Sequence, residues 1–248
     1  MASRHVGLAW LGLIASGLAI GPASAEPYPS RDKTPAPAFA PVRVPLDQIA
    51  PELRERVRAV VDQPTLATRG PVEAFACNPA VYAWLLDHPD QAVRLWRRLG
   101  AKCAEIQDKG KGRFAWSDGQ GSEIHWDTVL DTSDQRIWFA EGHVKPGLLL
   151  PSVPVRAVVV LTHAEGLDVK GRPAVRHQAG MILHTDSRTA ALAARLLGGS
   201  APRMAEQYVG QIQTFYAALA WYLEQHPELA ETLGKNQPPI TTPPRPGP

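Results

Sequence analysis

Residues 202–225 read PRMAEQYVGQIQTFYAALAWYLEQ, and this stretch decides which fold we expect. Its large apolar side chains recur every three or four residues, at Met204, Tyr208, Ile212, Phe215, Leu219 and Tyr222. Helical spacing places them on one apolar stripe, whereas Glu206, Gln213 and Glu224 can face water. At about 1.5 Å per residue such a helix spans roughly 35 Å, enough to lie across a whole sheet.

The segment before this helix is a series of short stretches rich in β-branched and aromatic residues. We expect strands over 72–77, 102–108, 112–117, 122–131, 135–144, 155–163 and 174–184. Short gaps that contain Gly, Asp or Ser, such as 109–112 and 132–134, separate many of them. Parallel neighbours need a long crossover, so these gaps predict antiparallel pairing.

Expected helices flank these strands. Residues 46–62 carry Leu, Ile and Val at near-helical spacing, and a further helix over 187–197 follows the last strand. Asn78 and Pro79 suit the N-cap and first turn of a helix over 79–87, and another helix over 91–99 follows it. This grouping of strands and helices favours a single α+β domain over 46–236.

This order of elements resembles the helix-grip fold of the START and polyketide-cyclase-like (SRPBCC) superfamily, to which the birch-pollen allergen fold is related. The resemblance covers roughly 70–226 and is carried by GPVEAF at 70–75, the helix pair around HPD at 88–90, and the amphipathic final helix. It implies a curved antiparallel sheet of about six or seven strands wrapped on the long C-terminal helix, with two short helices after the first strand. The extra helix at 46–62 and the Gly198-Gly199 break depart from that pattern.

The resemblance implies a ligand space between the sheet and the helix, and such folds commonly bind lipids, sterols or polyketides. Side-chain alternation along the strands predicts which residues face this space. The expected ligand-binding residues are Trp126, Phe139, Val159, Leu161, His177, Met181, Tyr208 and Phe215. The alternative is a solid core of the same side chains, because apolar alternation is identical in both cases.

Three functions remain open at this point. The first is binding of a hydrophobic small molecule or lipid without catalysis. The second is a cyclase- or hydrolase-like enzyme on the same scaffold, with His177 or His163 as general base, because each shares a strand face with apolar residues. The third is an envelope interaction protein with a solid core.

No cofactor and no metal are expected. A metal site needs several converging His, Cys, Asp or Glu ligands, and no motif such as HExxH is present. Nucleic acid is not an expected partner either, because 26 Lys and Arg residues nearly balance 24 Asp and Glu residues and no basic block stands out.

The N-terminus predicts export. Arg4 precedes an apolar run over 6–20, and the small residues at 23–25 are typical of a cleavage site before Glu26. We expect a signal peptide over 1–25, a proline-rich linker over 26–45 and a disordered proline-rich tail over 237–248. The mature protein is then periplasmic or extracellular, and an uncleaved anchor is the alternative.

Cys77 and Cys103 are the two cysteines of the chain. An oxidising compartment allows them to pair, so we expect a disulfide. Two buried free thiols are the alternative, because a sequence does not show the geometry that a bridge requires.

The loop after the strand at 135–144 carries three consecutive leucines, Leu148, Leu149 and Leu150, between two prolines. Such a run is unfavourable in water but suits a cover over an apolar opening. We expect a gate over the ligand space or a transient contact with a membrane or partner. A loop packed against the domain is the alternative.

Overall fold

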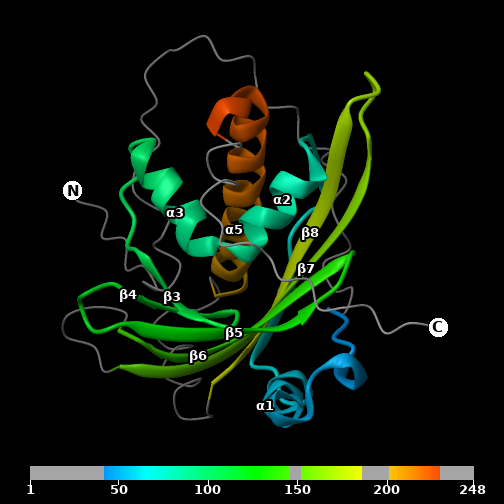
Figure 1. Cartoon of the computed structure of the whole chain (residues 1–248). Helices are drawn as coiled ribbons and strands as arrows, with labels where there is room; N and C mark the ends of the chain where they lie inside the picture. The colour runs from blue at the N-terminus through cyan, green and yellow to red at the C-terminus, as the bar shows by residue number, and fades with distance from the viewer. Residues whose placement is uncertain (1–41, 146–151, 186–200, 230–248) are drawn as a thin grey trace.

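The computed structural model describes residues 42–145, 152–185 and 201–229. Within these ranges the chain forms one eight-stranded antiparallel sheet with helices on both of its faces (Figure 1). The predicted signal peptide, nearly all of the linker, the tail and the helix over 187–197 lie outside the described residues. The same is true of the predicted gate, Leu148, Leu149 and Leu150.

The elements follow the predicted order. The helices are α1 (Pro51–Asp62), α2 (Pro79–Asp87), α3 (Pro89–Arg98) and α5 (Ala201–Gln225), and a 3-10 turn, η2 (Leu46–Gln48), precedes α1. The strands are β1 (Leu66–Arg69), β2 (Glu73–Ala76), β3 (Ile106–Gly110), β4 (Arg113–Ser117), β5 (Glu123–Asp131), β6 (Gln135–Val144), β7 (Val153–Leu167) and β8 (Pro173–His184). Their hydrogen-bonded order is β1-β8-β7-β6-β5-β4-β3, and β2 also pairs with β8.

Local sequence signals account for several helix starts. The Asn78 side chain accepts a hydrogen bond from the backbone N–H of Ala80 (2.9 Å), and Pro79 begins α2. This is the predicted N-cap. The first helix begins at Pro51 rather than at residue 46, because proline suits a first turn and breaks a helix that is already running.

Three strands differ from the prediction by more than two residues. Strand β3 begins at Ile106 rather than at residue 102, so residues 102–105, expected in a strand, are irregular. Strand β1 was not expected, and β7 continues to Leu167 instead of ending at residue 163. Strands β1 and β2 lie one after the other along the same edge of β8, where Leu66 pairs with Leu183 and Glu73 with His177. The short, half-exposed sequence of β1 gives little apolar alternation, so only its pairing with β8 identifies it as a strand.

Helix α5 passes directly over the junction of β1 and β2. The Gln213 amide donates a hydrogen bond to the Pro71 carbonyl (2.7 Å), and a Cβ at Gly70 would lie 1.9 Å from the Gln213 side-chain oxygen. Gln213 is fully buried, so the prediction that it faces water is wrong. Its amide replaces water as hydrogen-bond partner of the carbonyl at the strand junction.

The sheet is curved (Figure 1). Apolar clusters cover both of its faces. The main cluster lies between the inner face and helices α2, α3 and α5, and includes Val159, Leu161, Met181, Phe215 and Leu219. The outer cluster lies beneath η2 and α1, and includes Ile49, Val57, Val60, Ile137, Phe139, Val158, Val160 and Ile182. The α+β helix-grip arrangement is thus present, with an additional helix on the outside of the sheet.

The outer helix corrects one predicted ligand contact. Phe139 belongs to the outer cluster, where the Arg56 guanidinium of α1 lies 4.8 Å from its ring centroid, so it does not face α5. Trp138 and Ala140 face the main cluster instead. Because both faces of the sheet are covered, β6 is apolar at odd and even positions, and alternation does not identify its inner face.

The predicted disulfide is absent: Cys77 and Cys103 are both free thiols in the structure. Cys77 directly follows β2, which pairs with β8, whereas Cys103 precedes β3 at the opposite end of the strand order. The helices α2 and α3 span this interval. Burial raises the pKa of the Cys77 thiol to about 12, which keeps it protonated and unreactive.

The backbones of β5 and β6 come into close contact at Gly142. This glycine has a φ of 157°, and a Cβ placed on it would lie 2.1 Å from the Glu123 carbonyl oxygen. A methyl group there would have to push apart two paired strands, because its nearest neighbours are backbone atoms.

We expect Gly142→Ala to lower the free energy of unfolding by about 3 kcal/mol or more, the upper part of the usual range for overpacking. Chemical denaturation followed by circular dichroism measures this change. Gly166→Ala is the matched control, because nothing lies within 4 Å of a Cβ at that position of β7. Equal stability of the two variants would contradict the close approach of β5 and β6.

Candidate functional site

A chain of polar side chains lies inside the otherwise apolar main cluster. His177 of β8 and Tyr82 of α2 are each 1% exposed, and Glu73 of β2 is 5% exposed. The Tyr82 hydroxyl lies 2.7 Å from His177 Nδ1, and the Glu73 carboxylate lies 3.4 Å from His177 Nε2. Phe75 packs edge-on against the imidazole at 5.0 Å. Sheet register sets this contact, because Glu73 and His177 are direct cross-strand partners.

The partners of His177 hold its ring in place. Burial raises the pKa of Tyr82 well above its ordinary value, so its hydroxyl keeps its proton and forms a neutral hydrogen bond with Nδ1. The Glu73 carboxylate can only accept, so Nε2 is the donor of the hydrogen bond between them. Both ring nitrogens therefore have a partner, which holds the imidazole in one orientation.

His163 of β7, the other candidate base, lies beside this chain. It is the cross-strand partner of His177, it is half-buried, and its ring lies 5.7 Å from that of Tyr82. Burial lowers the pKa of His163, and the Arg136 guanidinium lowers it further. A lowered pKa leaves the imidazole unprotonated at neutral pH, which is the state a proton acceptor needs.

The positive charge near His163 belongs to an ion-pair group whose guanidinium is buried and whose two carboxylates are partly exposed. Arg136 of β6 is 5% exposed and pairs with Asp87 at the end of α2 (2.7 Å) and with Asp131 (2.9 Å). Tyr216 of α5 lies close enough to interact with this group, and burial raises its pKa. The guanidinium therefore ties the end of α2 to the sheet beneath it.

The structure brings most of the predicted ligand-binding residues together. Val159, Leu161, Met181 and Phe215 are buried in the main cluster with His177, and Trp126 packs against it. Tyr208 is a half-buried residue of α5. Apart from Phe139, these residues lie on the inner side of the sheet or on α5, and their role in ligand binding stays a prediction.

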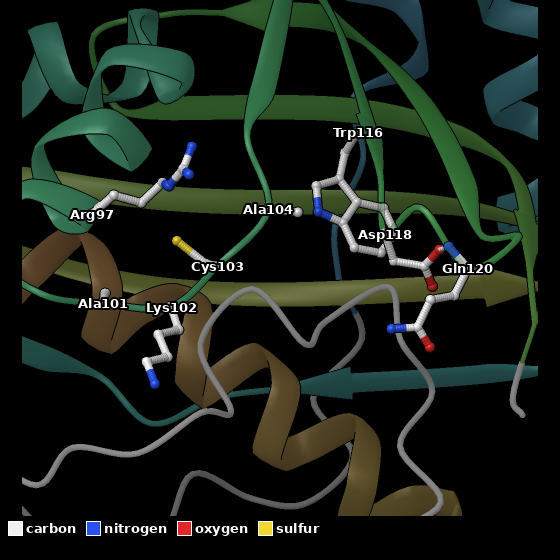
Figure 2. A pocket seen from close by; sticks show the side chains of 8 residues that line it. All are labelled: Arg97, Ala101, Lys102, Cys103, Ala104, Trp116, Asp118 and Gln120. Atoms are coloured by element: carbon white, nitrogen blue, oxygen red, sulfur yellow. Dashed lines mark hydrogen bonds between the residues drawn. The ribbon is translucent and has the colours of Figure 1, made fainter.

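A pocket of about 620 Å³ opens at the β3–β4 edge of the sheet, beside the end of α3 (Figure 2). It is lined by Arg97, Ala101, Lys102, Cys103, Ala104, Trp116, Asp118 and Gln120. We name it the edge pocket. Trp116 is 3% exposed and belongs to the main cluster, and Cys103 and Ala104 pack against that cluster.

Sequence reasoning missed the edge pocket except for Cys103, which it assigned to a disulfide. One signal was available, because Trp116 shares a strand face with Phe114 and both are large and aromatic. No comparable signal marks Lys102 or Gln120. These residues lie outside helices and strands, where sequence periodicity does not predict direction.

The charges around the edge pocket differ in how they are paired. Arg97 forms an ion pair with Glu105, whereas Lys102 is exposed and has no ion pair within the described ranges. Asp118 accepts hydrogen bonds from the backbone N–H groups of Gln120 (2.7 Å) and Ser122 (2.9 Å). Burial alone would raise the pKa of Asp118, but these hydrogen bonds and one from the Ser122 side chain outweigh it and lower the pKa.

A second pocket, of about 490 Å³, lies between the segment before α1 and the turn that joins β5 to β6. It is lined by Arg43, Val44, Pro45, Gln48, Thr132, Asp134 and Gln135. Val44 packs against the outer cluster, so this pocket is separate from the polar chain around His177.

Among the described residues, no three His, Cys, Asp or Glu side chains are placed to hold a metal ion. In the same part of the chain, no helix combines the length and the apolar character needed to cross a membrane.

Comparison with models of protein families finds no match, and comparison with curated protein sequences finds none. Among solved structures, norcoclaurine synthase from Thalictrum flavum in complex with dopamine and hydroxybenzaldehyde is 13% identical, with a TM-score of 0.34 over 60% of this chain and 86% of that chain. Ara h 8.0201 is 15% identical, with a TM-score of 0.38 over 64% of this chain and 98% of that chain.

The di-domain ARO/CYC BexL from the BE-7585A biosynthetic pathway is also 15% identical, with a TM-score of 0.38 over 70% of this chain and 54% of that chain. At such identities and TM-scores the likeness concerns the arrangement of helices and strands alone.

We expect Tyr82→Phe to lower the free energy of unfolding by about 1 to 2 kcal/mol, because it leaves the buried His177 Nδ1 without its hydrogen-bond partner. Urea denaturation measures the change. Tyr222→Phe is the control, because Tyr222 is a half-buried residue of α5 whose ring faces that of His226 at 4.4 Å. A loss for Tyr82→Phe no larger than that of the control would refute the buried hydrogen bond.

Proposed function

We propose that this chain is an exported binding protein for a hydrophobic small molecule or lipid, which enters at the edge pocket. The observation that carries the proposal is the continuity between this pocket and the core. Trp116 lines the pocket and is also a member of the main cluster, and Cys103 and Ala104 pack against that cluster. The apolar part of a ligand that occupies the pocket therefore extends the apolar interior.

Aromatic side chains lead from this end of the molecule into the interior. Trp96 of α3 precedes the lining residue Arg97 and meets Phe215 of α5 edge-on at 5.6 Å. Phe215 contacts Tyr216 at 5.1 Å, and Tyr216 stacks on Trp138 of β6 at 6.3 Å. This row supports an apolar ligand, because aromatic rings offer large apolar surfaces for packing.

A second candidate function is proton-transfer catalysis on the same scaffold. The hydrogen-bonded chain Tyr82–His177–Glu73 favours it, because a carboxylate orients the imidazole as acid–base chemistry requires. Its weakness is that both ring nitrogens already have partners, so a substrate must displace Tyr82 or Glu73 to reach the imidazole. The carrier is therefore the leading proposal, with His177 in a structural role.

The binding proposal predicts that a neutral apolar probe protects a thiol in the edge pocket. Cys103 is half-buried and Cys77 is fully buried, so N-ethylmaleimide should modify one thiol in the native protein. We expect N-phenyl-1-naphthylamine to fluoresce on binding and to slow this reaction. Ligand extraction followed by mass spectrometry of the purified protein tests for a natural occupant.

Two variants locate the probe. Ala104→Trp fills the edge pocket and should weaken probe binding about tenfold, or about 1.4 kcal/mol. Ala164→Trp places the same side chain on an exposed part of β7 and should leave binding unchanged. Absence of probe binding, or equal binding by both variants, would favour the solid-core interaction protein instead.

Export is the second part of the proposal. Expression of the full chain with its own N-terminus should yield a protein that begins at Glu26, because signal peptidases cleave after small residues such as those at 23–25. Mass spectrometry of the periplasmic and extracellular fractions measures the start of the mature chain. An intact residue 1–25 segment in the membrane fraction would show an uncleaved anchor instead.

A further inference from the structure

The edge pocket contains a buried hydrogen-bond donor that has no acceptor. Trp116 is 3% exposed, and its Nε1 atom is inaccessible to solvent and lacks a partner among the described residues. Figure 2 shows this nitrogen turned toward Ala104, on the side of the pocket where Cys103 also lies. An indole N–H can only donate, so this donor stays unpaired among the described residues unless an acceptor reaches it from the pocket, past the Ala104 side (Figure 2).

Comparison with other tryptophans separates this donor from a general feature of the core. The Nε1 atoms of Trp84 and Trp138 are also buried without a partner in the described part of the chain. Neither residue belongs to the lining of the edge pocket. Trp116 therefore combines an unpaired buried donor with a pocket that can admit a ligand.

Positive charge lies in the same pocket. Lys102 is exposed and has no ion pair within the described ranges, and the Arg97 guanidinium has donors beyond the one that it gives to Glu105. Figure 2 shows Arg97, Lys102 and Cys103 on one side of the view, with Trp116, Asp118 and Gln120 on the other. Donors therefore approach the pocket from both sides.

The carboxylate in the lining, Asp118, does not provide the missing acceptor. One of its oxygens already accepts two backbone N–H groups, at 2.7 Å from Gln120 and at 2.9 Å from Ser122. These hydrogen bonds hold the carboxylate against its own turn. Its charge is partly offset there by the two N–H dipoles, so Lys102 keeps its attraction for an anion.

We infer that the ligand of the edge pocket is an apolar molecule with a carboxylate group, for which the Trp116 indole N–H and the Lys102 ammonium are the partners. This inference rests on the proposed binding function and adds the chemical class of the ligand. A carboxylate has acceptor oxygens for both donors and opposes the Lys102 charge, whereas an ester lacks that charge. The hydrocarbon part of the proposed ligand packs against Cys103 and Ala104, which lie beside the main cluster.

The test compares dodecanoate with methyl dodecanoate on the mature protein at neutral pH, below micelle formation. The readout is the concentration that halves the rate at which N-ethylmaleimide modifies Cys103, relative to the rate of the same variant without ligand. We expect dodecanoate to give half-protection at a concentration about tenfold lower than the ester does. The acid forms a charge-assisted hydrogen bond that the ester cannot form, and the free energy of such a bond corresponds to a ratio of this size.

Two variants test the two donors separately. Lys102→Gln should raise the dodecanoate concentration for half-protection about three- to tenfold and change that for the ester less than about twofold. Trp116→Phe should raise the half-protection concentrations of both ligands, because the ester carbonyl oxygen accepts from the same indole N–H. Lys170→Gln, in the exposed turn between β7 and β8, should change neither. Lys102 is exposed, so its replacement remains informative if Trp116→Phe lowers stability in a thermal melt.

The outcomes separate the inference from the proposed function. Equal protection by acid and ester in the unmodified protein overturns the carboxylate assignment but leaves apolar binding intact. The carboxylate assignment is also overturned if Lys102→Gln raises the half-protection concentrations of dodecanoate and of the ester by the same factor. Protection by neither ligand, together with no binding of N-phenyl-1-naphthylamine, removes both the inference and the proposed function.

Discussion

The contact between α5 and the concave face of the sheet buries apolar surface that neither element can bury alone. Val209, Leu219 and Leu223 of the helix are inaccessible or nearly so, and they share one cluster with strands from β8 to β3. The sheet curves toward the helix, and the close approach of β5 and β6 at Gly142 accompanies this curvature. The remaining features of the molecule are positioned by this one layer of contact.

Burial on this scale also determines what polar groups inside the molecule can do. Tyr82, His177 and Glu73 lie where water does not reach, and each hydrogen bond among them offsets the cost of removing a polar group from water. Arg136 has two carboxylate partners for the same reason. Together these groups stabilise the contact between the helices and the sheet. An interior donor without such a partner needs a separate explanation.

One of the unpaired donors, the Trp116 indole N–H, lies where regular packing ends. Between α3 and β3 the chain is irregular, and Lys102, Cys103 and Ala104 of this segment form one wall of the edge pocket. Strand β4 supplies the opposite wall through Trp116. At the other edge of the sheet, β1 and β2 are held against α5 by Gln213. Helix α5 therefore contacts the β1–β2 edge, whereas the β3–β4 edge carries the edge pocket. This difference is the reason why we propose that a ligand enters at the β3–β4 edge.

The sequence alone determined the order of the elements apart from β1, the α5 helix, the N-cap at Asn78 and the inward positions of Val159, Leu161, His177 and Met181. These features depend on local periodicity and capping. Tertiary structure decided the rest. Phe139 faces outward because α1 covers the second face of the sheet, and Cys77 and Cys103 stay apart because strand order separates β2 from β3. The edge pocket also arises from contacts between distant segments, which no local pattern records.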